Sequence, residues 1–504
     1  MNSSASTPAH PSGNDPDPRE DGNASNGNTS NGNTSNGNTS DGNTSVLLVV
    51  GVGTLLGALA GSSVTVALPH IGSHYGLSIA SVRWVVSAYL VAVTTLLLPA
   101  GRLGDLLGHR VIYLTGFALF GVTSLLCGLA PSFSIVVLGR VLQGIGAALL
   151  MATGPALLTT NVPGNRRGRA LGMVATATYA GLTVGPSLGG FLVDVGSWRW
   201  VFFINVPVTL AVCVLGALAL PPSPRQRASF DGWGTVALLL GFTPLLVTIS
   251  HGGRGAGLPV PLPVLGGVGV LGMGAFAWIQ GRARDPLVRF GVFRNKTFTT
   301  AVLSATGNYV ALFIPIILTP FFLTEGVGLS PGRTGLVLST QPVIMALVAS
   351  PSGWLSDRMG TRPLAASGMF VMAAGLFGLS WVEAESSPYT VAAWLGLAGL
   401  GTGMFISPNS SALMGSAPSS EQGIAGGILA VARNLGMLLG VAAATGFYSF
   451  HGGQTGAAWG GADFRAFSLC LRYATVAALL SGLVALFGGS PASPNDSAGL
   501  RQKE

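Results

Sequence analysis

Two ten-residue segments concentrate charge and glycine in a chain of which only 8% is charged. Residues 101–110 read GRLGDLLGHR and residues 353–362 read GWLSDRMGTR, with Gly, Asp, Gly and Arg at the same offsets. Glycine permits sharp turns and close helix packing, and a helix N-terminus or an arginine stabilises an aspartate. We predict a gate that clamps two parts of the protein in one state; a loop that merely fixes chain orientation is the alternative. The predicted gate residues are Gly101, Asp105, Gly108, Arg110, Gly353, Asp357, Arg358, Gly360 and Arg362.

The composition identifies an integral membrane protein. The 504 residues are 49% hydrophobic and have a mean hydropathy of +0.59. A soluble protein of this length carries about 25% charged residues, which it needs to cover a water-facing surface. The net charge of +8 comes from arginines in short gaps between apolar runs, which indicates membrane topology rather than nucleic-acid binding. The bias towards Arg, Gly and Ala is typical of a GC-rich, actinobacterial genome.

Fourteen apolar stretches are long enough to cross a bilayer. With the N-terminus inside, most loop arginines fall on the inner side, so we expect both termini, and both gate segments, in the cytoplasm. The predicted spans are 46–69, 81–100, 111–130, 134–159, 170–193, 200–220, 232–250, 258–280, 297–323, 334–356, 363–382, 389–414, 424–449 and 469–488.

The chain contains a long internal repeat. Residues 142–168 align with 397–423, so that Gly144 matches Gly399 and Gly146 matches Gly401. Two homologous halves whose motif copies lie on the same side of the membrane are parallel repeats, which are typical of two-bundle secondary transporters. We expect five parts: a disordered cytoplasmic tail with NGNTS repeats at 1–45, a six-helix bundle at 46–220, two extra helices with linkers at 221–296, a second six-helix bundle at 297–488 and a cytoplasmic tail at 489–504.

Several motifs resemble the major facilitator superfamily, in particular its fourteen-helix drug:proton antiporter branch. The 101–110 segment resembles the family's loop signature, LGRVLQGIGAA with Arg140 and Gln143 its helix-four signature, and GLTVGPSLGG the antiporter signature of helix five. The overall pattern is similar to antibiotic self-resistance exporters of actinomycetes. The resemblance implies an all-α, two-bundle fold and alternating access, with drug efflux in exchange for protons. It also implies a gating kink at Gly181, Gly185, Pro186, Gly189 and Gly190.

Ionisable residues inside a membrane are costly and therefore functional candidates. Arg140 lies within a predicted span, and the resemblance gives it a coupling role with Gln143; an arginine bonded to backbone carbonyls is the alternative. Arg433 is a second candidate, with a helix-end position as its alternative. No Asp or Glu falls mid-span, and Ala60 stands where the family commonly has an acid. The remaining proton-carrying candidates are Asp105, Asp194 and Glu325.

The substrate cavity is predicted from polar and aromatic residues within spans. Trp84 and Tyr89 either line an aromatic drug pocket or pack at the membrane interface. Asn308, Gln341 and Asn409 either line the cavity or hydrogen-bond between helices.

These features favour a transporter in the cell membrane that exports a drug or antibiotic and confers antibiotic resistance. An uncoupled facilitator or an importer of a small organic solute is the alternative. An enzyme is not expected, because GVGVLG at 267–272 lies inside an apolar span and no nucleotide-binding loop of the GxxxxGK[ST] type occurs. We expect a monomer without metal, cofactor or nucleic-acid partner, driven by the proton gradient.

Overall fold

The computed structural model describes residues 36–162, 167–223, 231–250, 261–283, 286–418, 422–453 and 459–488. Most of the two predicted tails, residues 1–35 and 489–504, lies outside these ranges. The chain divides into two compact units, Met1–Ser40 and Asp41–Glu504, and the description below concerns the second.

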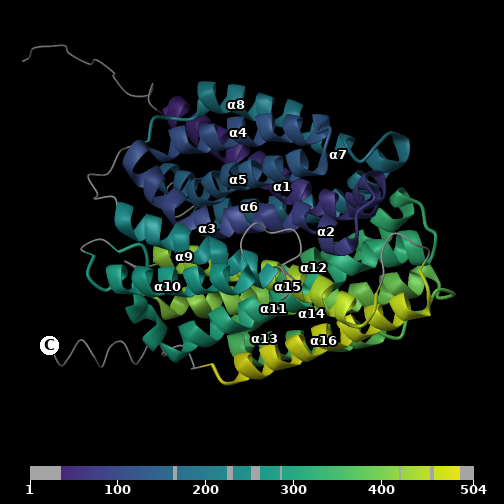
Figure 1. Cartoon of the computed structure of the whole chain (residues 1–504). Helices are drawn as coiled ribbons and strands as arrows, with labels where there is room; N and C mark the ends of the chain where they lie inside the picture. The colour runs from purple at the N-terminus through teal and green to yellow at the C-terminus, as the bar shows by residue number, and fades with distance from the viewer. Residues whose placement is uncertain are drawn as a thin grey trace, which may run out of the picture. The chain divides into compact units, whose positions relative to one another are not determined.

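Every regular element in the described ranges is a helix (Figure 1). The prediction of an all-α membrane protein is confirmed, and each predicted span coincides with one helix or with two consecutive ones. The helices are α1 (Asn36–Tyr75), α2 (Ile79–Val82), α3 (Trp84–Leu107), α4 (His109–Leu129), α5 (Phe133–Asn161), α6 (Arg167–Val195), α7 (Trp200–Phe203), α8 (Asn205–Ala219), α9 (Gly232–Ser250), α10 (Leu262–Gln280), the 3-10 helix η2 (Phe290–Arg294), α11 (Lys296–Phe321), the π-helix η3 (Phe322–Gly326), α12 (Pro331–Met359), α13 (Thr361–Leu379), α14 (Pro388–Ser416), α15 (Gln422–Phe450) and α16 (Gly461–Leu486).

Thirteen helical segments of the described chain are long and apolar enough to cross a membrane. The helix outside this set is α6, which is 29 residues long but contains GLTVGPSLGG. Glycine, threonine, serine and proline lower its hydropathy, and these small residues allow α6 to pack closely against other helices.

Two helices begin earlier than the apolar pattern predicts. α16 begins at Gly461 rather than near 469, because the Asp463 carboxylate accepts a 2.9 Å hydrogen bond from the Gly460 backbone at the helix start. α1 begins at Asn36, so the last ten residues of the predicted 1–45 tail are helical. Extending an existing helix is far less costly than nucleating one.

Both gate segments form the predicted sharp turn. Gly108 separates α3 from α4 with φ 96°, and Gly360 separates α12 from α13 with φ 88°. Residues with a side chain rarely adopt this conformation, so glycine is required at both positions. An even number of spans separates the two turns, which therefore lie on the same side of the membrane; we call it the motif side and the other the far side.

The repeat is also visible in helix packing. Gly144 of α5 lies against the Tyr89 carbonyl of α3, and its counterpart Gly399 of α14 lies against the Gln341 carbonyl of α12. In the same way Gly146 faces Gly116 of α4, and Gly401 faces Gly368 of α13. A methyl group at any of these glycines would meet backbone atoms, so the small residues set the helix spacing in both halves.

The two helices between the halves, α9 and α10, pack against each other (Figure 1). Their closest approach is at Gly241 and Gly272, where a side chain on either would meet the other's backbone. α9 also contacts α3, where the Thr243 hydroxyl donates to Thr95 at 3.4 Å.

Candidate functional site

Helix α6 lies between α1 and α12, which belong to different halves of the chain. Gly181, Gly185 and Gly189 are spaced four residues apart and form one face of α6, which packs on α1. Gly181 meets the Leu55 carbonyl, and the Ser62 hydroxyl of α1 donates to the Gly181 carbonyl at 3.3 Å. The predicted kink glycines thus bring α6 and α1 into backbone contact.

The other face of α6 packs on α12 at the far side. Gly190 lies against the Pro331 carbonyl, and Gly335 lies against the Pro186 carbonyl. The hydroxyl oxygens of Ser187 and Ser339 are 2.6 Å apart. Small residues on both helices therefore hold the two halves in close contact, and α6 remains continuous through Pro186.

Asp194 completes this contact. Its carboxylate, at the end of α6, accepts a 2.7 Å hydrogen bond from the Gly332 backbone and a 3.4 Å hydrogen bond from the Ser330 hydroxyl, at the start of α12. A negative charge is stabilised at a helix N-terminus, where backbone N–H groups have no partner within the helix. The contact between the two halves thus includes a titratable group.

Arg140 is buried in a network of neutral groups inside the first half. Its side chain is 2% exposed and donates to the Val85 carbonyl at 2.6 Å and to the Gln143 side-chain oxygen at 2.5 Å. Gln143 donates in turn to the Ser124 hydroxyl at 2.6 Å, and the guanidinium lies 4.2 Å from the centre of the Tyr89 ring. Arg140 thus bonds to a backbone carbonyl, as the structural alternative expects, and Tyr89 packs against it, while its coupling role stays a prediction.

The first gate segment has different ion pairs from those expected. Asp105 contacts Arg102 at 3.9 Å and the His109 ring nitrogen at 3.4 Å. Arg110 instead donates to the Ala217 carbonyl of α8 at 2.6 Å. Arg102 and His109, rather than Arg110, therefore lie beside Asp105, because the chain changes direction at Gly108 and Arg110 reaches the end of α8.

The second gate segment repeats the backbone but not the side-chain contacts. Asp357 is exposed, and Arg358 lies 3.9 Å from the centre of the Trp354 ring. Gly353 packs on the Ser407 side chain, whereas its counterpart Gly101 has more open surroundings beside Ala152. Arg362 lies next to the turn and is half-buried.

Asn409, Asn308 and Gln341 differ in how their amides are satisfied. Asn409 of α14 accepts from the Ser304 hydroxyl at 2.9 Å and donates to the Ala301 carbonyl at 3.0 Å, so it links α14 to α11. Asn308, one turn further along α11, is fully buried, and neither of its amide atoms has a partner among the described residues. The same holds for the amide nitrogen of Gln341 on α12. Leaving a buried amide without a partner is costly. The prediction that Asn308 and Gln341 line the cavity stays a prediction, whereas Asn409 hydrogen-bonds between helices.

Carboxylates and aromatic rings cluster at the far-side ends of α11 and α16. Glu325, in the π-helical turn η3, accepts a 3.2 Å hydrogen bond from the Trp459 indole. Asp463 is 6% exposed and accepts a 2.8 Å hydrogen bond from the Tyr448 hydroxyl. Asp463 is not among the predicted site residues, because it lies before the predicted start of the last span, 469–488. An acid two residues after a Gly-Gly pair was the available signal, since acids favour the first turn of a helix.

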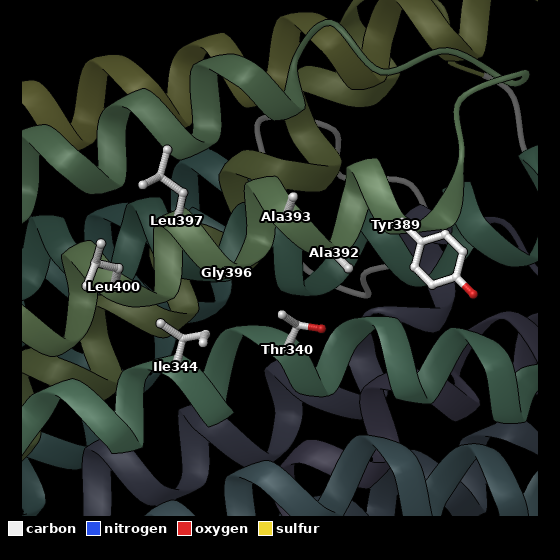
Figure 2. Close-up of a pocket in the computed structure, with 8 residues that line it drawn as sticks. All are labelled: Thr340, Ile344, Tyr389, Ala392, Ala393, Gly396, Leu397 and Leu400. Atoms are coloured by element: carbon white, nitrogen blue, oxygen red, sulfur yellow. The ribbon is translucent and has the colours of Figure 1, made fainter.

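A shallow apolar cavity of about 480 Å³ lies along α12 and α14 (Figure 2). Thr340 and Ile344 line it from α12, and Tyr389 and Leu400 line it from α14. Trp84, the other predicted aromatic cavity residue, is not part of this lining and lies half-buried at the start of α3. With few polar groups, the cavity offers little that would orient a substrate.

Comparison with known proteins agrees with this architecture. The sequence profile of the Major Facilitator Superfamily matches residues 50–314 and 297–503. The tetracenomycin C resistance and export protein of Streptomyces glaucescens is 34% identical over 79% of this chain and 74% of its own length. Multidrug resistance protein Stp of Mycobacterium tuberculosis is 30% identical over 79% of this chain and 74% of its own length.

Two further similarities come from a different transporter and from a solved structure. Riboflavin transporter RibZ of Clostridioides difficile is 30% identical over 80% of this chain and 88% of its own length. The crystal structure of a bacterial homologue of the human lysosomal transporter Spinster, inward-facing and unoccupied, aligns with a TM-score of 0.63 at 16% identity and covers 88% of this chain and 95% of that one. At 16% identity, the similarity to this solved structure shows that the two chains share a fold.

Proposed function

Because the chain belongs to the Major Facilitator Superfamily, a family of multi-pass membrane transporters rather than enzymes, we propose that it exports a drug or antibiotic from the cytoplasm by alternating access, in exchange for protons. The relatives named for multidrug resistance and for tetracenomycin C export support this substrate class. Bacterial relatives also support a location in the bacterial cell membrane, and the distribution of loop arginines supports cytoplasmic termini. In this orientation the motif side is cytoplasmic.

The observation that carries the proposal is the contact between α6 and α12. Gly190 and Gly335 bring backbones from the two halves together at the far side. An exporter that exchanges two solutes must not leak, and small residues allow a seal tight enough to exclude both. Opening this seal while the motif side closes is alternating access.

Protonation of Asp194 is a physical route to coupling. Its charge is stabilised by the start of α12, which belongs to the other half. A proton arriving from outside neutralises the carboxylate, weakens this contact and favours opening of the far side. Glu325 and Asp463 lie at the same side and are further proton acceptors, whereas Asp105 lies at the motif side. No resident cofactor is required, because the proton gradient supplies the energy.

An uncoupled facilitator or importer remains the second candidate. The relative named as a riboflavin transporter favours it, as does the lack of a mid-span carboxylate in the sequence. The two candidates differ in whether transport depends on the pH gradient.

Inside-out vesicles that contain the full chain distinguish them. We would impose an acid-interior gradient, with and without a protonophore, and follow the uptake of a panel of antibiotics and lipophilic dyes. Gradient-dependent uptake that is lost in Asp194→Asn, and kept in Glu385→Gln as an exposed far-side control, is the expected result. Uptake that ignores the gradient would exclude the antiporter and favour the facilitator.

A further inference from the structure

Three polar side chains lie at a similar depth in mid-membrane, on helices of both halves. They are Tyr179 of α6, Tyr309 of α11 and Arg433 of α15. These are the fifth, ninth and thirteenth spans, so all three helices start at the motif side. At about 1.5 Å per residue, the three residues lie roughly 16–20 Å from those starts, near the middle of a bilayer. We propose that this cluster, which we call the Arg433 site, binds an aromatic organic anion and makes such anions the preferred cargo.

Packing brings α15 and α11 together at this depth, and Tyr179 of α6 lies within electrostatic range of both Arg433 and Tyr309. Gly436, one turn from Arg433, packs on the Tyr309 side chain and fixes the spacing of α15 and α11. The site thus joins a side chain of the first half to two of the second.

Arg433 has unused capacity for an anion. Its one recorded hydrogen bond runs to the Ser410 hydroxyl of α14 at 2.9 Å, although a guanidinium offers five donors. It is half-buried, and the ion pairs recorded among the described residues involve Asp105 and do not include it. A charged group in mid-membrane without a counter-ion is costly unless a ligand or water reaches it.

The chemistry of the site selects the cargo. A guanidinium pairs with a carboxylate through two parallel hydrogen bonds. The phenols of Tyr179 and Tyr309 add donors, and their rings pack against a flat aromatic ligand. Arg140, buried within the first half, is occupied by Val85, Gln143 and Tyr89 and leaves this role to Arg433. A cationic drug would meet a positive charge here, so the site opposes it.

This inference rests on the proposed transport function, but binding tests it without a gradient. We would measure binding of 1-hydroxy-2-naphthoate and of the matched cation trimethyl-2-naphthylammonium to the full chain in detergent. We expect the anion to bind more tightly, and Arg433→Gln to weaken its binding at least about tenfold while leaving the cation unaffected or bound more tightly. Arg433→Lys should weaken it less, because the charge remains, and Arg472→Gln on α16 is the matched control that should not change it.

Three results would overturn the proposal: unchanged anion affinity in Arg433→Gln, stronger binding of the cation than of the anion, or an equal loss in Arg472→Gln. If Arg433→Gln does not fold, Tyr179→Phe and Tyr309→Phe take its place, and unchanged anion affinity in both has the same consequence. If anion binding depends on Arg433 but vesicle uptake does not depend on the pH gradient, proton-coupled export is refuted. The assignment of the Arg433 site as an anion-binding site is then still supported.

Discussion

Replacing Gly335 with alanine tests whether the α6–α12 contact is the far-side seal. The added methyl carbon would lie against the Pro186 carbonyl group. It would be 2.9 Å from the carbonyl carbon of Pro186 and 3.1 Å from the Cα of Ser187. These distances are too short for carbon atoms, so the helices must separate. Overpacking of this kind costs about 1–3 kcal/mol, which shifts the population of the far-side-closed state by about 5- to 150-fold.

A disulfide measures that population directly. The hydroxyl oxygens of Ser187 and Ser339 lie 2.6 Å apart, so cysteines at these positions come within bonding range when the seal is closed. In a background without Cys127, Cys213 and Cys470, we would follow oxidation of the Ser187→Cys/Ser339→Cys pair by counting free thiols over time. We expect crosslinking to slow by at least about fivefold when Gly335→Ala is added.

The matched control is Gly172→Ala, also on α6, where an added methyl group meets nothing within 4 Å. Alanine stabilises a helix by about 1 kcal/mol relative to glycine. Both variants have this stabilisation, but only Gly335→Ala also has the steric clash. Equal crosslinking rates in the two variants would refute the assignment of Gly335 to the seal. Thermal unfolding of both proteins shows whether slower crosslinking reflects opening of the seal rather than loss of the fold.

Three further substitutions test the packing described above. Gln143→Leu leaves the Arg140 guanidinium and the Ser124 hydroxyl without their partner, and we expect a loss of about 1–3 kcal/mol, measured by denaturation in detergent; an unchanged midpoint would contradict the network. Gly108→Ala forces a side chain into φ 96°, and we expect about 1 kcal/mol of destabilisation, with equal stability of Gly101→Ala and Gly108→Ala as the contrary result. Asn409→Leu removes two hydrogen bonds between α14 and α11, and we expect a lower unfolding temperature than for Asn161→Leu, whose amide bonds only within its own helix and to its neighbour.

The sequence predicts the backbone of this protein well because glycine and hydropathy act locally. The offsets shared by Gly108 and Gly360 identify two turns, and both have positive φ. The alignment of Gly144 with Gly399 likewise identifies two positions where helices touch through their backbones. Such positions tolerate no side chain, so the need for glycine can be predicted from the sequence without knowing which helix lies opposite.

Side-chain partners could not be read in the same way. The pairing of Asp105 with His109, and of Arg110 with α8, depends on how the chain leaves the Gly108 turn. Asp463 was missed because an acidic residue in the first turn lowers hydropathy just where the helix begins. The Arg433 site unites three helices that are distant in sequence, and no spacing along the chain encodes it.

The two halves therefore have the same backbone arrangement but differ in the polar side chains that they place inside the membrane. In the repeat, Arg140 of α5 aligns with Leu395 of α14, which is 1% exposed in the hydrophobic core. In the first half, Arg140 donates to Val85 and Gln143. In the second half, Arg433 has guanidinium donors without a recorded partner, and neither amide atom of Asn308 has a partner among the described residues. If recognition follows this division, polar substitutions in the second half alter which cargo is bound. Substitutions in the Arg140 network then lower the stability of the protein, or lower the transport rate of every cargo by the same factor. A change of cargo preference in Gln143→Leu would show that the first half also takes part in recognition.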